Sequence, residues 1–107
     1  MKFDVYLTAA AEDDIFDIYQ YVYFNDSPAN ANLVFSRLQE TCTTLREFPE
    51  RGHVPPELER INIRDYKEIH YKPYRIIYSI VETRVFIHCI FDGRRDLQDI
   101  LEKRILR

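Results

Sequence analysis

Residues 64–92 read RDYKEIHYKPYRIIYSIVETRVFIHCIFD, and this stretch decides the fold. It divides into three runs rich in Ile, Val, Tyr and Phe, at Arg64–Tyr71, Tyr74–Glu82 and Arg84–Asp92. Short β-prone runs separated only by Lys72-Pro73 and by a corner at Thr83 are typical of an antiparallel meander. The middle run has few polar residues, and we expect it to form the central strand.

Upstream of the meander, the sequence predicts two adjacent helices. Thr8 is a candidate N-cap for a helix that ends near Asn25 and carries an apolar stripe at Ala11, Ile15, Ile18, Tyr19 and Val22. Ser27 and Pro28 then suit the cap and the first position of a second helix. Its stripe comprises Ala31, Val34, Phe35, Leu38, Cys42 and Leu45. The short connection predicts an antiparallel helical hairpin.

The remaining segments complete one α+β domain over residues 1–107. Residues 3–7 alternate as a short strand, and residues 48–60 hold three prolines and read as a loop. After Gly93, a final helix is marked by Leu97, Ile100, Leu101 and Ile105. The predicted order is β-α-α-β-β-β-α, with the hairpin packed on an antiparallel sheet and a C-terminal helix.

Composition and charge narrow the class of protein. Hydrophobic residues make up 46% and charged residues 31%, as in ordinary globular domains. Residues 1–60 hold five basic and eleven acidic side chains, and residues 61–107 hold ten and seven, so only the C-terminal half is basic. This balance disfavours nucleic acid as the main partner. With no long apolar stretch and two cysteines in apolar runs, Cys42 and Cys89, we expect a cytoplasmic protein with reduced thiols and no membrane contact.

Motifs of cofactor enzymes and metalloenzymes are absent from the sequence. Two isolated glycines cannot form a phosphate-binding loop, and the cysteines lack metal-ligand spacing. The three histidines share no short motif, so we predict no metal site and no cofactor. A cationic set interleaved with tyrosines remains, and it could stabilise a phosphate or fill the edges of a sheet. Its members are Arg64, Lys67, Lys72, Arg75, Arg94 and Arg95.

The order and spacing of several short pieces resemble the RelE/ParE family, the toxins of type II toxin–antitoxin systems. The pieces are Ile63-Arg64, the KPYRIIY run at residues 72–78, the GRRDL run at residues 93–97, the AAAEDDIFDIYQYV run at residues 9–22, and FPERG at residues 48–52. The resemblance implies two N-terminal helices on an antiparallel sheet, and an antitoxin as partner. It also implies one of two activities, mRNA cleavage on the ribosome or inhibition of DNA gyrase.

The resemblance favours the ParE-like branch. RNA-cutting relatives carry two arginines that Arg75 and Arg95 match, and strand lysines of which Lys67 is at best one. They also need a tyrosine in the final helix, where this chain has Leu101. If the chain is an endonuclease, Arg75, Arg95 and Lys67 are its catalytic candidates. Arg75 has the alternative role of pairing with a carboxylate within the sheet. A third alternative is a relative that binds an antitoxin and has no target.

The family resemblance also implies where this chain binds its target and its antitoxin. A gyrase inhibitor needs an exposed surface rather than an acid–base pair, and the candidates for target binding are Arg94, Arg95 and Arg104. The alternative for the first two is an ion pair with Asp92, Asp96 or Asp99. The antitoxin, ParD-like or similar, is expected along the outer side of the hairpin, where four aromatic residues lie off the main stripes. These are Phe16, Tyr23, Phe24 and Phe35. They could instead pack on each other.

Overall fold

The computed structural model describes residues 2–104, and its elements follow the predicted order with two short additions. The strands are β1 (Asp4–Leu7), β2 (Lys67–Tyr71), β3 (Tyr74–Val81) and β4 (Arg84–Asp92). The helices are α1 (Ala9–Asn25), α2 (Pro28–Thr43), α3 (Pro56–Glu59) and α4 (Leu97–Arg104). The additions are a 3-10 helix, η1 (Thr44–Arg46), directly after α2, and the short helix α3, which lies within the expected loop. None of the described helices is long and apolar enough to cross a bilayer.

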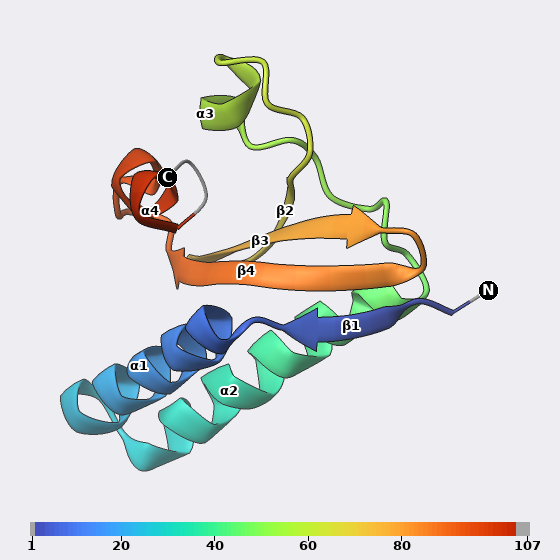
Figure 1. The fold of residues 1–107 in the computed structure, drawn as a ribbon. Coiled ribbons are helices and arrows are strands. Elements are labelled where there is room, and N and C mark those ends of the chain that lie inside the picture. The colour runs from blue at the N-terminus through green and yellow to red at the C-terminus, as the bar shows by residue number, and fades with distance from the viewer. Residues whose placement is uncertain (1, 105–107) are drawn as a thin grey trace.

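The four strands form one sheet in the order β1-β4-β3-β2 (Figure 1). The predicted antiparallel meander of β2, β3 and β4 is confirmed, with β3 inside the sheet. The prediction of a wholly antiparallel sheet is wrong for β1, which pairs parallel to β4 with Asp4 opposite Arg84 and Leu7 opposite Ile87. Tight turns determine only the direction of neighbouring strands, whereas β1 reaches β4 across the whole intervening chain.

Local capping explains where the helices begin. The Thr8 hydroxyl accepts from the Ala11 amide at 3.2 Å. The Ser27 hydroxyl accepts from the Asn30 amide at 3.0 Å, and Pro28 takes the first helical position, so both predicted helix starts are confirmed. The Asp96 carboxylate likewise accepts from the amide of Gln98 at the start of α4. Ile105 of the predicted α4 stripe lies outside the described residues.

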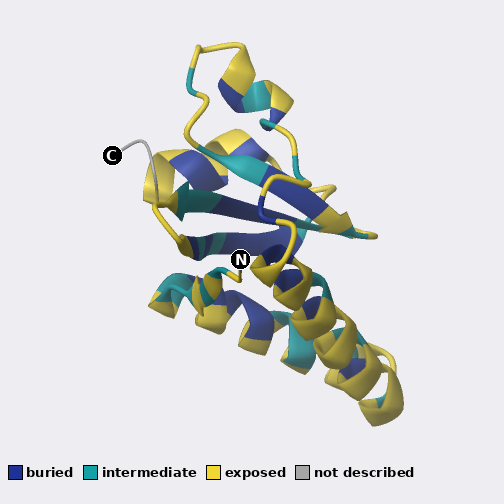
Figure 2. Cartoon of the chain, turned by 90° about the vertical axis from the view of Figure 1, so that its right-hand side faces the viewer, coloured by how far each residue is buried: buried dark blue, intermediate teal, exposed yellow. Residues whose placement is uncertain are grey.

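The sheet is covered on both faces, and each face has its own apolar cluster. The hairpin of α1 and α2 covers one face, while α3 and α4 lie over the other (Figures 1 and 2). Alternate residues of β3 therefore enter different clusters, with Ile76 and Tyr78 toward the hairpin and Ile77 toward α4. Burial on both faces explains why the β3 sequence has so few polar residues.

The loop after α2 is fastened to the sheet by Tyr78. This side chain is fully buried, and its hydroxyl donates to the Pro49 carbonyl oxygen at 2.7 Å. The same hydroxyl accepts from the Gly52 amide at 3.1 Å. A Cβ atom at Gly52 would lie 2.6 Å from both the Glu68 carbonyl oxygen and the Tyr78 hydroxyl. Only glycine therefore allows the loop to approach β2 and β3 this closely.

We predict that Tyr78→Phe lowers the free energy of unfolding by roughly 1–3 kcal/mol, because it leaves the Pro49 carbonyl and the Gly52 amide without their partner. Chemical denaturation of the variant and of the parent checks this. Tyr6→Phe, at an exposed tyrosine of β1, is the matched control and should stay within about 0.5 kcal/mol of the parent. Equal stability of Tyr78→Phe and the parent would contradict the prediction.

Candidate functional site

Two adjacent arginines form an exposed corner where the chain leaves β4; we call Arg94 and Arg95 the arginine corner. Gly93 positions it, because its amide donates to the Pro73 carbonyl oxygen at 2.8 Å and a Cβ atom would lie only 3.0 Å from that oxygen. The guanidinium of Arg94 forms two hydrogen bonds to Asp92, yet its side chain is 85% exposed. Arg95 is exposed too and, within residues 2–104, has no ion-pair partner. The expected alternative of a pair with Asp92 thus applies to Arg94.

A hollow of about 510 Å³ adjoins the arginine corner, between α1 and the ends of β3 and β4. Tyr21, Tyr74 and both arginines line it, together with the carboxylates of Asp17 and Asp92. The hollow therefore combines aromatic side chains with charges of both signs. Such a surface suits contact with a macromolecule, because aromatic residues and arginine contribute most at interfaces.

The third sequence candidate for target binding, Arg104, lies elsewhere. Its guanidinium forms a two-bond ion pair with the nearly buried Asp14 of α1. Asp14 also accepts from the Ile90 amide at 2.9 Å, at a point where β4 extends beyond the end of β1. This ion pair ties α4 to α1 and β4, so the structure gives Arg104 a contact inside the fold.

Arg75 lies between two carboxylates on the face of the sheet that α3 covers. Its Nε and Nη2 atoms donate to Glu68 at 2.8 and 2.9 Å, and its Nη1 and Nη2 atoms donate to Glu57 at 2.9 and 3.0 Å. Its guanidinium also lies 5.4 Å from the centre of the Phe91 ring. We call Glu57, Glu68 and Arg75 the carboxylate–arginine cluster. The sequence alternative, in which Arg75 pairs with a carboxylate in the sheet, describes this geometry.

The charges of this cluster depend on one another. The hydrogen bonds that Arg75 donates hold the pKa of Glu57 below its ordinary value, and the acceptance of these bonds by Glu57 and Glu68 raises the pKa of Arg75. A carboxyl group with a depressed pKa stabilises the fold above its unfolded-state pKa, and this stability is lost as the pH falls through the folded-state value. The ion pair between Glu57 and Arg75 therefore persists at neutral pH.

Aromatic residues line the outer side of the hairpin, as the sequence predicted. Phe35, Tyr19, Tyr23 and Phe24 form a chain of ring contacts with centroids 5.1–6.1 Å apart, which we call the aromatic row. The row packs on itself and stays accessible, since Phe24 is 77% exposed and Phe35 is 37% exposed. Phe16 is also exposed. Both alternatives from the sequence, mutual packing and exposure, apply together.

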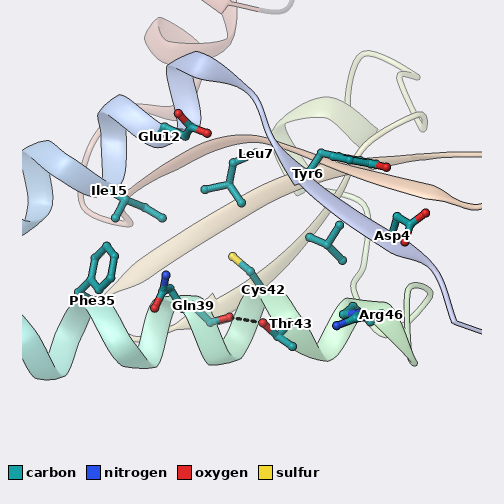
Figure 3. A pocket seen from close by; sticks show the side chains of 11 residues that line it. Asp4, Tyr6, Leu7, Glu12, Ile15, Phe35, Gln39, Cys42, Thr43 and Arg46 are labelled. Carbon is teal, nitrogen blue, oxygen red and sulfur yellow. Dashed lines mark hydrogen bonds between the residues drawn. The ribbon is translucent and has the colours of Figure 1, made fainter.

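A groove of about 870 Å³ continues from the aromatic row between β1 and α2 (Figure 3). Phe35 and Ile15 lie at one end of this groove, and Asp4 and Arg46 lie at the other. The edge of β1 that does not pair with β4 borders it. Row and groove together offer an elongated surface in which apolar side chains alternate with polar ones, and a peptide segment of a partner could lie along it.

Both cysteines lie in the core of the protein. Cys42 and Cys89 are buried thiols in the two separate apolar clusters, and burial raises the pKa of each to about 12, as expected for unreactive core residues.

His53 and His70 lie beside Glu68, with donor atoms of the three residues within 4.8 Å of one another. The sequence predicted no metal site, because nothing in the spacing of the histidines indicates this proximity.

The sequence does not predict several residues of these sites. Tyr19, predicted in the core stripe, joins the aromatic row, and Tyr21 lines the hollow beside the arginine corner. Glu57 lies in a segment predicted as loop, and Glu68 had no role. Only the alternation along β2, which puts Glu68 on the face opposite Ile69, could have indicated an inward carboxylate.

The architecture agrees with solved toxin–antitoxin structures. The chromosomal ParDE system from P. aeruginosa contains a chain that superposes with a TM-score of 0.71 at 15% identity, covering 85% of this chain and 96% of that one. The toxin–antitoxin complex RelBE2 from Mycobacterium tuberculosis contains one with a TM-score of 0.63 at 18% identity, covering 86% and 99%. No curated protein matches the sequence significantly.

The fold is thus one that toxin–antitoxin complexes contain, a helical hairpin on a four-stranded sheet with a C-terminal helix. Residues 5–97 match the family described as ParE toxin of type II toxin-antitoxin system, parDE. The chain belongs to this family. The match covers the described elements except the first residue of β1 and all but the first residue of α4, and it confirms the family resemblance and its ParE-like branch.

We predict that Arg75→Ala lowers the free energy of unfolding by roughly 3–5 kcal/mol, because it leaves the buried Glu68 carboxylate without its charged partner. Chemical denaturation at neutral pH measures the loss. The control is Arg84→Ala, at an exposed arginine of β4 whose contact to Glu82 is 4.0 Å long. A loss no larger than that of the control would show that the carboxylate–arginine cluster contributes little to folding.

Proposed function

We propose that this type II toxin inhibits DNA gyrase by binding it, and that a cognate antitoxin neutralises it. The observation that carries the proposal is the engagement of Arg75. Four hydrogen bonds to Glu57 and Glu68 occupy the one strand arginine that matches the RNA-cutting pattern, and the two carboxylates outweigh its charge. A guanidinium in this state has little capacity left to stabilise a phosphate.

Two further positions favour binding over RNA cleavage. Leu101, where RNA-cutting relatives need a tyrosine, is 1% exposed and packs against Ile77 and Cys89 in the core cluster under α4. Lys67 forms an ion pair with Glu50 at 3.3 Å at the start of β2, whereas the arginine corner follows the end of β4. The three catalytic candidates Arg75, Arg95 and Lys67 are therefore not gathered into one hollow in the described part of the chain.

Target binding is assigned to the arginine corner and the hollow beside it. Two solvent-facing guanidinium groups next to Tyr21 and Tyr74 suit an acidic protein surface or the phosphates of DNA held by gyrase. Arg104 contributes indirectly, because its ion pair with Asp14 links α4 to α1. Binding of this kind requires no cofactor and no acid–base pair.

The antitoxin is assigned to the aromatic row and the groove between β1 and α2. The row lies on the helical hairpin and the groove lies between the hairpin and β1, and both expose apolar surface that a partner segment would bury. The solved relatives in the comparison are toxin–antitoxin systems, which supports a partner of this kind. The antitoxin then binds the folded toxin and raises its stability by mass action.

A supercoiling assay tests the proposed target. The purified chain should inhibit ATP-dependent supercoiling by gyrase, and Arg94→Ala combined with Arg95→Ala should raise the half-inhibitory concentration roughly tenfold or more, as expected for interface arginines. The melting temperature of this variant should stay within about 5 °C of the parent, because both side chains face solvent.

The matched control for this assay is Arg64→Ala combined with Arg84→Ala, which removes two exposed arginines elsewhere and should leave inhibition unchanged. Full inhibition by the arginine-corner variant would contradict the assignment of the surface. If the chain instead cuts mRNA at codon-phased positions in a ribosome assay and leaves supercoiling intact, its activity is that of an endonuclease, and the proposal of gyrase inhibition is wrong.

Antitoxin docking is tested by placing a charge in the aromatic row. We predict that Phe35→Glu or Tyr23→Glu weakens the toxin–antitoxin complex roughly tenfold or more in calorimetric titration, because a carboxylate would be buried at an apolar contact. Ile61→Glu, at an exposed apolar residue just beyond α3, is the control and should bind normally. Unchanged affinity of both row variants would place the antitoxin on another surface.

A further inference from the structure

Three side chains with metal-binding atoms meet at one end of β2. Glu68 and His70 are two residues apart on this strand, so both side chains point to the face that α3 covers. His53 comes from the preceding loop and joins them through an isolated bridge to Glu68. The His53 amide donates to the Glu68 carbonyl at 3.2 Å, and the Glu68 amide donates to the His53 carbonyl at 2.7 Å. The backbone thereby fixes the relative position of all three residues.

The distances between the side-chain donor atoms suit a tetrahedral ion. The His53 Nε2 atom lies 3.4 Å from Glu68 Oε2, and the His70 Nε2 atom lies 2.9 Å from Glu68 Oε1. Ligand atoms at zinc-bond lengths in a tetrahedron are roughly 3.3 Å apart. The largest separation within the group is 4.8 Å or less, and the two imidazoles are exposed enough to close it by rotating.

Glu68 is held in place by a charged partner behind it. The carboxylate is 1% exposed and receives two hydrogen bonds from Arg75, which use two of its roughly four lone-pair positions. The other positions face the imidazoles. Glu57 forms a second pair with Arg75, so the carboxylate–arginine cluster carries a net negative charge that favours a cation. The solvent-exposed Arg60 lines the same hollow and opposes this charge in part.

We propose that His53, Glu68 and His70 bind a zinc ion, with two imidazole nitrogens and one carboxylate oxygen as ligands and the fourth position open to water. This mixed nitrogen and oxygen set is typical of zinc. The bound ion links the loop that carries His53 to the edge strand β2, beside the point where Arg75 joins Glu57 to the sheet. The site is independent of the arginine corner and of the proposed gyrase inhibition.

Zinc titration of the purified chain, prepared without a histidine tag and stripped with a chelator, tests the site. We expect one zinc ion per chain in calorimetry and a melting temperature that rises with zinc concentration. Replacement by Co²⁺ should give the intense visible absorption of a tetrahedral site. No bound zinc and no thermal shift would overturn the proposal.

Variants locate the bound ion. His53→Ala and His70→Ala should each weaken zinc binding at least about tenfold, since even residues that only support ligands contribute this much. His88→Gln is the matched control, because this histidine bonds Ser79 on another part of the sheet and should leave zinc affinity unchanged. Parent-like zinc affinity in a variant that carries both His53→Ala and His70→Ala, or loss of zinc binding in the His88→Gln control, would overturn the assignment. His53→Gln and His70→Gln give the same test if an alanine variant fails to fold.

Discussion

Burial of β3 and β4 on both faces is the constraint on which the rest of the structure depends. The two inner strands can be covered only if the hairpin packs on one side and α3 and α4 pack on the other. Both glycines of the chain lie where backbone must approach this pair closely, Gly52 against Tyr78 and Gly93 against Pro73. Each connecting segment is therefore shaped by the need to reach its face of the sheet.

Two buried carboxylates fasten distant segments to this frame. Asp14 joins α1 to β4 and to Arg104 of α4, while Glu68 joins β2 to Arg75, which also holds Glu57 of α3. Buried ion pairs add little net stability, but breaking one is costly, so they select a single arrangement of the elements. The ion pairs also hold three charged side chains of the C-terminal half inside the fold, namely Glu68, Arg75 and Arg104. The arginine corner, by contrast, stays accessible.

The two surfaces proposed for function both use α1. Tyr21 lines the hollow beside the arginine corner, whereas Tyr19 and Tyr23 belong to the aromatic row. A partner on one surface therefore touches the helix that also borders the other. This shared helix offers a direct physical route by which an antitoxin on the row would hinder a target at the corner. Neither surface involves the histidines beside Glu68, on which the zinc proposal rests.

The sequence by itself determined the elements whose signals are local. Caps at Thr8 and Ser27 and the β-prone runs after residue 64 predicted the element order, and the position of four hairpin aromatics off the apolar stripes indicated that they could be accessible. Only the tertiary structure decided the parallel pairing of β1. It also decided the partners of Arg75 and Arg104 and the meeting of His53 with His70. These contacts join residues far apart in the chain, and no local spacing encodes them, because they arise when separate elements cover the same sheet.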